Sequence, residues 1–252
     1  MNLTLYGVEI WAVALVFARV GAMVMLLPGL GEPAIPTRAR LGFALMLAAL
    51  LAPTIAPQVP PPPDGAWGLA GMLIGELLIG VMLGSTARLM MTALATAGQI
   101  MGLEIGLAFA QTADPTMTQS GQILAVFLGL LGITLVFATG LHHLFLRGIA
   151  GSYELFSPGA PVPVADGAAL ALDTVSTSFR VGFQIAAPVI AAGLIFRVGL
   201  GALARLIPTI QVFFVVIPLQ LLGGFVVIGL GLSAGMLVWL DSIQRYGESM
   251  VK

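Results

Sequence analysis

The sequence predicts an all-α polytopic integral membrane protein, and three observations support this fold class. Of its 252 residues, 59% are hydrophobic and 8% are charged, whereas an ordinary soluble domain has about 25% charged residues. Apolar runs long enough to cross a hydrocarbon core of about 30 Å recur along the chain. The 32 glycines, many of them four residues apart, suit close packing of helices in lipid. We therefore expect a single membrane domain over residues 1–252.

Hydropathy windows of about 19 residues divide the chain into six or seven hydrophobic helices. The last run would be far longer than a hydrocarbon core as one helix, so it must tilt, kink or fold back. Pro218 and the pair Gly223 and Gly224 provide a place for the bend. In chain order, the predicted segments are 10–28, 41–56, 66–87, 89–110, 122–146, 181–204 and 209–240.

Two polar connections separate these segments. Residues 57–65 are rich in proline and predict a stiff linker with polyproline character. Residues 147–180 form the longest polar connection and contain a run of Pro, Gly and Asp that is typical of loops. Arginines follow so many of the apolar segments that strict alternation would place them on both sides of the membrane. Some segments are therefore expected to form hairpins that do not cross the bilayer in the usual way.

Glycines at a spacing of four residues predict close contacts between helices. Gly80 and Gly84 lie about 180° around a helix from Gly71 and Gly75, so this helix could be held by two neighbours. The simpler alternative is that membrane helices are rich in glycine in general. Further tracts of the same kind occur at Gly98, Gly102 and Gly106 and at Gly231 and Gly235.

Charged residues inside or beside the apolar runs form a second pattern: Arg19, Glu76, Glu104 and Arg180. Unpaired ions are expensive in a membrane interior, so these side chains should pair or face water. They could line an ion or proton pathway, or they could form ion pairs that fix the register of helices. The second interpretation is favoured, because no acidic residue recurs at the helical spacing that a proton relay would need.

Residues 106–121 interrupt two apolar helices without any Lys or Arg, and Pro115 disfavours helix at Asp114. An ordinary external loop and a re-entrant loop that lines a cavity are both compatible with this composition.

Enzyme chemistry finds no support in the sequence. The run Gly231 to Gly235 matches a nucleophile elbow, but that motif needs a strand-turn-helix and a later histidine. His142 and His143 precede it, and as adjacent residues they are expected on different helix faces, which excludes a two-ligand metal grip. Cysteine is absent, and a net charge of −1 leaves no basic patch for nucleic acid. We expect no catalytic residue, no metal and no cofactor.

Several stretches resemble the FliR family of flagellar export-gate subunits, which is related to the SctT proteins of injectisomes. In chain order they are Phe17-Ala-Arg19 with Pro28, Glu76-Leu-Leu-Ile-Gly80, Gly106-Leu-Ala-Phe109 with Asp114-Pro115, and Arg205-Leu-Ile-Pro208 with Phe213 and Pro218. The resemblance covers nearly the whole chain. The family's Arg-x-x-Pro-Gln-x-Asn-x-Phe pattern has Thr209 and Gln211 here in place of Gln and Asn, so the polar contact made at those positions is altered.

The resemblance implies a non-enzymatic core subunit of the flagellar type III export gate. Its partners would be FliP-like, FliQ-like and FlhB-like subunits in a helical assembly, in the bacterial inner membrane at the flagellar basal body. Its cargo would be unfolded flagellar proteins. Residues 106–121 would plug the closed channel, with Gly106, Leu107, Phe109, Gln111, Asp114, Pro115 and Met117 as plug residues. Packing and assembly would involve Arg19, Glu76, Gly80, Gly98, Gly102, Glu104, Arg205, Pro208, Gln211, Phe213 and Pro218.

Two alternatives stay open at the level of sequence. An injectisome gate subunit would share the same fold and mechanism. A small ion-coupled transporter would instead use Arg19, Glu76 and Glu104 near its midplane.

Overall fold

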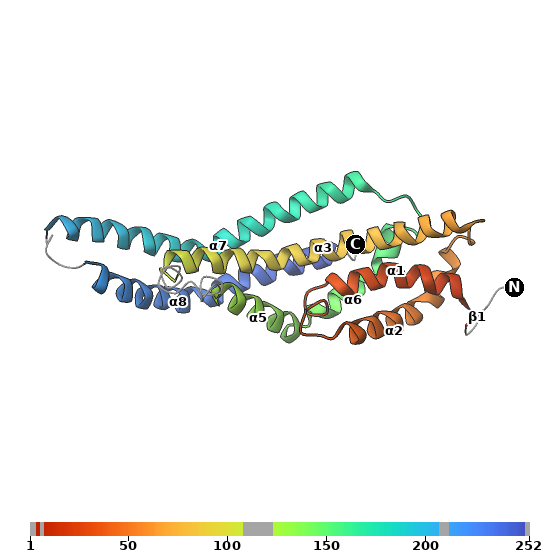
Figure 1. Cartoon of the computed structure of the whole chain (residues 1–252), viewed down its shortest axis with the longest axis horizontal. Helices are drawn as coiled ribbons and strands as arrows, with labels where there is room; N and C mark the ends of the chain where they lie inside the picture. The colour runs from red at the N-terminus through yellow and green to blue at the C-terminus, as the bar shows by residue number, and fades with distance from the viewer. Residues whose placement is uncertain (1–3, 6–7, 108–122, 207–211, 250–252) are drawn as a thin grey trace. The chain divides into compact units, whose positions relative to one another are not determined.

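A computed structural model of the chain describes residues 4–5, 8–107, 123–206 and 212–249, and nearly all of them are helical (Figure 1). A two-residue antiparallel pair, β1 and β2, precedes the first helix. The element bounds are β1 Thr4–Leu5, β2 Val8–Glu9, α1 Ile10–Leu26, α2 Thr37–Ile55, a 3-10 turn η1 Ala56–Gln58, α3 Ala66–Glu104, α5 Ile123–Ala138, α6 Leu141–Leu155, α7 Val164–Leu206 and α8 Val212–Ser249.

Several helices are long enough and apolar enough to cross a membrane. Within the described ranges, four helices qualify as spans, in the regions Thr37–Gln58, Ala66–Glu104, Val164–Leu203 and Val216–Glu248. The pair α5 and α6 would qualify together, but it is bent by 75° at the break between them. Helix α1 is apolar and shorter, with 17 residues. The prediction of an all-α polytopic membrane protein is confirmed.

The hydropathy windows placed several helix ends wrongly. Segments 66–87 and 89–110 form one continuous helix, α3, of 39 residues. Arg88 lowers the local hydropathy at the expected junction without breaking the helix, since its guanidinium pairs with Glu32 and is 40% exposed. Segment 122–146 is instead divided at Gly140, whose φ of +75° is a left-handed conformation that glycine adopts without strain.

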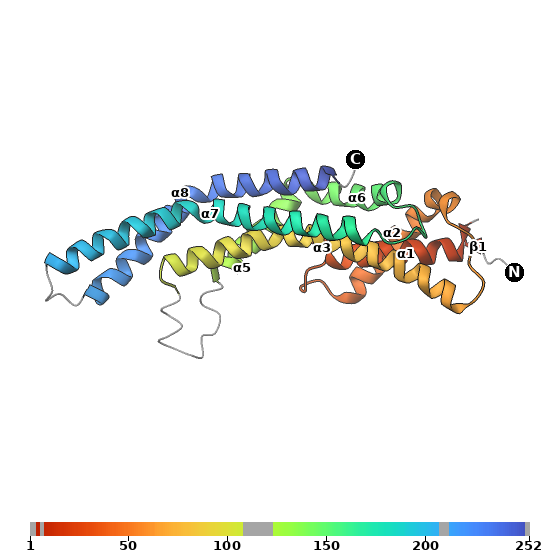
Figure 2. The same cartoon turned by 90° about the horizontal axis from the view of Figure 1, so that it is seen from above.

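The expected connection 147–180 is largely helical. Helix α6 extends to Leu155 and α7 begins at Val164, so only residues 156–163 lie outside helices. Hydropathy reports how apolar a segment is, whereas residues such as Ala and Leu favour helix at moderate polarity. Asp166 in the first turn of α7 also interacts favourably with the helix dipole. The final run does not fold back: α8 continues through Pro218 over 38 residues (Figure 2).

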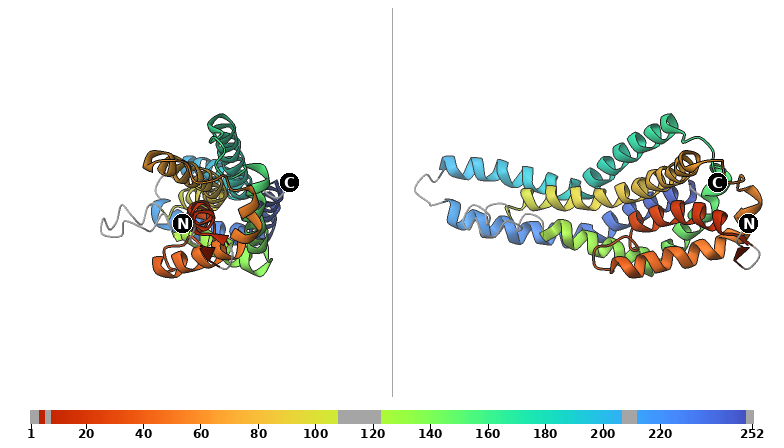
Figure 3. Two further views of the ribbon diagram at one scale, coloured as in Figure 1. Left: turned by 90° about the vertical axis from the view of Figure 1, so that its right-hand side faces the viewer. Right: turned by 45° about the vertical axis from the view of Figure 1, so that its right-hand side comes forward.

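The chain forms two compact units, and the long helices contribute to both. Unit 1 comprises residues 1–89, 136–175 and 243–252, and unit 2 comprises residues 90–135 and 176–242. In unit 1, α1 and α2 lie side by side (Figure 3). The buried residues of α2 include a stripe of Ala44, Ala48 and Ala52, each fully buried. Small residues at a spacing of four allow this close approach.

Unit 2 is packed around glycines and one tryptophan. The Trp239 side chain is 1% exposed, and its Nε1 donates to the Met90 carbonyl at 3.0 Å. A Cβ atom on Gly98 would overlap the backbone of Ala125 in α5. A Cβ atom on Gly182 in α7 would lie 2.9 Å from the Ala93 carbonyl oxygen. Close packing at Gly98 therefore brings α5 onto α3, as the glycine spacing predicted in general terms.

Candidate functional site

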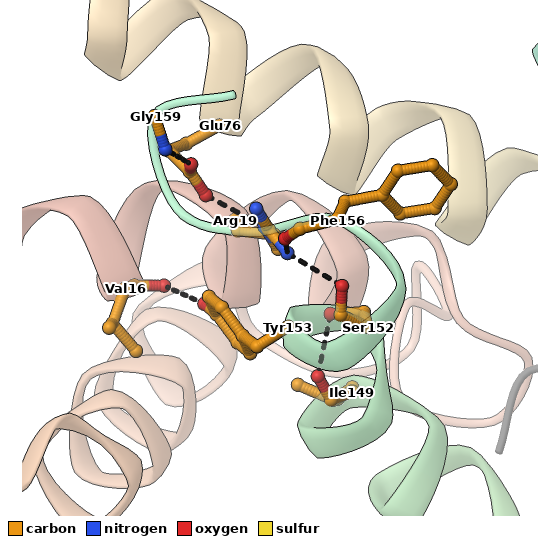
Figure 4. Close-up of polar contacts among 8 residues, drawn as sticks. All are labelled: Val16, Arg19, Glu76, Ile149, Ser152, Tyr153, Phe156 and Gly159. Atoms are coloured by element: carbon orange, nitrogen blue, oxygen red, sulfur yellow. Dashed lines mark hydrogen bonds and ion pairs between the residues drawn. The ribbon is translucent and has the colours of Figure 1, made fainter. Parts of the chain in front are cut away.

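A buried polar cluster in unit 1 joins four parts of the chain (Figure 4). Arg19 comes from α1, Glu76 from α3, Ser152 and Tyr153 from α6, and the remaining contacts from the connection between α6 and α7. The Arg19 side chain is 0% exposed and that of Glu76 is 1% exposed. At this burial each charge needs a partner, since an isolated ion in an apolar interior is costly.

The Arg19 guanidinium bonds to one carboxylate and two backbone carbonyls, whereas its Nη2 atom has no hydrogen-bond partner among the described residues. Its Nε donates to Glu76 Oε2 at 2.7 Å, and its Nη1 donates to the carbonyl oxygens of Ser152 and Phe156, both at 2.8 Å. The guanidinium carbon lies 4.2 Å from the centroid of the Tyr153 ring, within the range of a cation–π interaction. The two carbonyls lie at the C-terminal end of α6, where the helix dipole favours a cation.

Glu76 is held on its other side by the connection after α6. Its Oε1 accepts a hydrogen bond from the Gly159 backbone N–H at 2.8 Å. Gly159 has a φ of +74°, a conformation that side chains rarely adopt, and a Cβ atom there would lie 2.7 Å from the Met72 methyl carbon. The Tyr153 hydroxyl donates to the Val16 carbonyl at 3.2 Å, which is a second contact between the cluster and α1. Both carboxylate oxygens are thus engaged within the chain.

The cluster supports the interpretation that these charges fix helix register. Replacing one member of a buried pair leaves the other charge without compensation, which costs about 3–5 kcal/mol. A shift of α1 by one residue along α3 would break the short Arg19–Glu76 contact and both carbonyl contacts together. The arrangement therefore defines one alignment of α1, α3 and α6.

The glycine face of α3 lies directly beside this cluster. A Cβ atom on Gly80 would lie 2.5 Å from the Arg19 carbonyl oxygen, and one on Gly84 would lie 2.9 Å from Leu26 Cβ. This face therefore holds α1 at a distance that only glycine allows. On the opposite face, a Cβ atom on Gly75 would lie 3.9 Å from Val162 Cγ2, and nothing described lies within 4 Å of a Cβ atom on Gly71.

The C-terminal end of α3 in unit 2 is a second organised region. The Leu107 N–H donates to the Gly102 carbonyl at 3.0 Å, and the Gly106 N–H donates to the Leu103 carbonyl at 3.2 Å. With Gly106 at a φ of +85°, these bonds form a Schellman motif. Gly106 and Leu107, predicted as plug residues, therefore lie in the cap of α3, and the Gly102 carbonyl completes it.

Glu104 forms an ion pair with one helix of unit 2 and a backbone hydrogen bond with another. Its Oε2 pairs with Arg197 Nη2 of α7 at 2.9 Å, and its backbone carbonyl accepts from Gln220 Nε2 of α8 at 2.5 Å. The sequence did not predict Arg197 or Gln220 as a partner of Glu104. A polar amide within the apolar run 209–240 was the available signal, since such groups in membrane helices bond to other helices.

The other predicted residues divide into three groups. Arg205 is exposed near the end of α7, Phe213 and Pro218 belong to α8, and Gly98 packs against α5. Arg180 is exposed on α7 and donates to Thr177 Oγ1 at 3.4 Å, so it is not buried within the chain as Arg19 and Glu76 are. Outside the described residues lie Phe109, Gln111, Asp114, Pro115, Met117, Pro208 and Gln211.

Two features considered for catalysis have other environments. The run 231–235 lies inside α8 and so lacks the strand-turn-helix of a nucleophile elbow. His142 and His143 begin α6 with ring centroids 4.0 Å apart, which corrects the expectation that they point to different faces. Adjacent Cβ atoms on a helix diverge by about 100°, but two ring side chains can still turn toward each other across that angle. No group of three or more metal-ligating side chains occurs in the described parts of the chain.

Comparison with known proteins gives consistent matches over most of the chain. Residues 10–246 match a family described as bacterial export proteins, family 1. The chain is 48% identical over 248 residues to the flagellar biosynthetic protein FliR of Caulobacter vibrioides, with 98% of both chains covered. It is 33% identical over 220 residues to FliR of Escherichia coli, covering 87% of this chain and 81% of that protein. FliR of Bacillus subtilis is 28% identical over 222 residues.

Proposed function

Because the chain belongs to the FliR family of bacterial export proteins, we propose that this component of the flagellar export apparatus forms and plugs the channel through which unfolded flagellar proteins cross the membrane. The match to a FliR protein over 98% of both chains carries the proposal. The gate acts by conformational change and has no bond chemistry of its own.

The proposed plug is the segment 106–121. Its composition supports this role, because it contains no Lys or Arg that would trap an acidic cargo. Its start is well defined, since α3 ends at Glu104 and is capped through Leu107.

The proposed partners are FliP-like, FliQ-like and FlhB-like subunits in the bacterial inner membrane. Low burial within the chain supports an assembly. In an apolar 18-residue stretch of α8, only 11% is buried, and in the corresponding stretch of α7 only 17% is buried. Leu222 and Leu230 of α8 are 68% and 80% exposed. We propose that these exposed apolar faces contact the partner subunits as well as lipid.

A small-solute transporter built on Arg19 and Glu76 has less support. A coupling carboxylate must exchange its proton or ion during the cycle. Both oxygens of Glu76 are bonded within the chain, one to the guanidinium and one to Gly159. The cluster is therefore better suited to holding helices than to binding a transported ion.

Deletion of residues 110–118 tests the plug. The variant is co-expressed with its FliP-like, FliQ-like and FlhB-like partners, and leakage of a small solute across the membrane is measured. We expect leakage well above wild type, while the tagged chain still co-purifies with its partners. Unchanged permeability in a complex of normal yield would contradict the plug. Failure of the wild-type chain to co-purify with any such subunit would contradict the proposed assembly.

A further inference from the structure

A cavity of about 330 Å³ lies in unit 2 between α7 and α8, which run side by side there (Figure 2). Its α7 residues are Val189, Ala192, Gly193 and Phe196, and its α8 residues are Leu219, Gln220, Gly223, Gly224 and Val227. On each helix these residues recur every three or four positions, so they share one face of that helix. The cavity is therefore a slot that runs along the two helices, and we call it the α7–α8 slot.

The slot is nearly as long as one leaflet of a bilayer is thick. Its lining covers residues 189–196 of α7 and 219–227 of α8, which correspond to about 10–12 Å at 1.5 Å per residue. A hydrocarbon core of about 30 Å leaves about 15 Å to each leaflet. Both helices belong to regions that are long and apolar enough to cross a membrane, Val164–Leu203 and Val216–Glu248. The slot thus has the length and the surroundings of a lipid chain.

The wall of the slot offers few polar groups to a ligand. Among the described residues that line it, Glu104 and Gln220 alone have polar side chains. The Gln220 amide donates to the Glu104 carbonyl at 2.5 Å, and the Glu104 carboxylate pairs with Arg197 at 2.9 Å. A buried water needs two to four polar partners, whereas a cavity with apolar walls stays dry and takes up apolar molecules. The slot is therefore suited to a hydrocarbon ligand.

The slot is closed by α3 and open at an apolar rim. Ile105 is 2% exposed and lies so close to α8 that a Cβ atom on Gly224 would overlap its side chain. Leu219 also lines the slot but is 55% exposed, so it marks the opening. The nearby Leu222 and Ile195 are 68% and 74% exposed. A molecule would thus enter across an apolar surface, which favours a lipid chain over a polar ligand.

We propose that the α7–α8 slot binds one acyl chain of a membrane lipid, which enters sideways from the bilayer. The chain fills the space that the small residues Ala192, Gly193 and Gly223 leave between the helices. A linear hydrocarbon chain fits the length of the slot, whereas a compact apolar molecule would leave part of it empty. The bound chain completes the packing between α7 and α8, so the lipid is a structural ligand of this protein.

The test uses the complete export complex in phospholipid vesicles. The vesicles contain a small fraction of a phosphatidylcholine probe with a photoreactive diazirine in its acyl chain. After illumination and proteolysis, mass spectrometry locates the labelled residues, and the total label on the complex serves as the reference. In the wild-type complex we expect label on residues 189–196 of α7.

Two substitutions on α8 distinguish the slot from the outer surface. Gly223→Leu puts a larger side chain into the slot, where nothing described lies within 4 Å of a Cβ atom. Gly229→Leu is the matched control, because its Cβ position is equally open but lies outside the slot. We expect Gly223→Leu to lower the label on residues 189–196 about tenfold, which corresponds to about 1.4 kcal/mol of binding free energy. Gly229→Leu should leave this label unchanged.

Ala192→Leu fills the slot from α7 and should lower the label on Phe196 in the same way, so the test does not depend on assembly of one variant. The proposal is overturned if residues 189–196 carry no label in a wild-type complex of normal total labelling. A partner subunit or another segment of this chain would then occupy the slot. It is equally overturned if both slot-filling variants are labelled like wild type, because the probe would then have reported lipid at the outer surface.

Discussion

Replacing Glu76 with glutamine removes one negative charge from a buried site and changes the side chain's shape very little. Glutamine can still accept the Gly159 N–H through its Oε1 atom, as Glu76 does at 2.8 Å. Its amide would face Arg19 Nε, however, where the carboxylate accepts a hydrogen bond at 2.7 Å. Arg19 would then be a fully buried cation without its anionic partner.

The expected cost follows from this burial. Breaking a buried ion pair by removing one partner costs about 3–5 kcal/mol, because the remaining charge stays out of water. Arg19 keeps the carbonyls of Ser152 and Phe156, which places Glu76→Gln towards the lower end of that range. At about 2–4 °C per kcal/mol for a chain of this size, the thermal midpoint should fall by at least about 6 °C.

The assay is the thermal midpoint of the purified export complex, with two comparison variants. Arg88→Gln breaks the exposed pair with Glu32, whose atoms are 3.4 Å apart, and should cost at most about 1 kcal/mol. Adding Arg19→Met to Glu76→Gln removes the uncompensated cation and should recover part of the loss. The reasoning is refuted if Glu76→Gln is no worse than Arg88→Gln, or if the double variant is no better than Glu76→Gln.

Three further predictions concern packing. Gly80→Ala should destabilise the complex by about 1–3 kcal/mol, because its methyl group would meet the α1 backbone, whereas Gly71→Ala should not lower the thermal midpoint. Trp239→Phe should lower stability by about 1–3 kcal/mol through the lost hydrogen bond to the Met90 carbonyl and the smaller buried ring, which a midpoint within 1 °C of wild type would contradict. Gly102→Leu should impair assembly by a few kcal/mol of lost close packing, measured as complex yield on co-purification.

The sequence by itself determined that this protein resides in a membrane and that its secondary structure is helical. Both depend on local composition: 8% charged residues and long apolar runs permit little besides helices that satisfy their own backbone groups in lipid. The close approach at Gly80 and Gly84 was also predictable, since their spacing puts them on one face of a helix. The family followed from the order of short motifs along the chain.

The tertiary structure decided which residues meet. Arg19 pairs with Glu76, 57 positions away, and with the Ser152 carbonyl, 133 positions away. Neither a periodicity nor a hydropathy window contains such long-range information. The same holds for Glu104, whose partners come from α7 and α8, and for Arg180, which is exposed on α7. Local composition reports the cost of burying a charge, but the packing of distant helices determines whether it is buried and what compensates it.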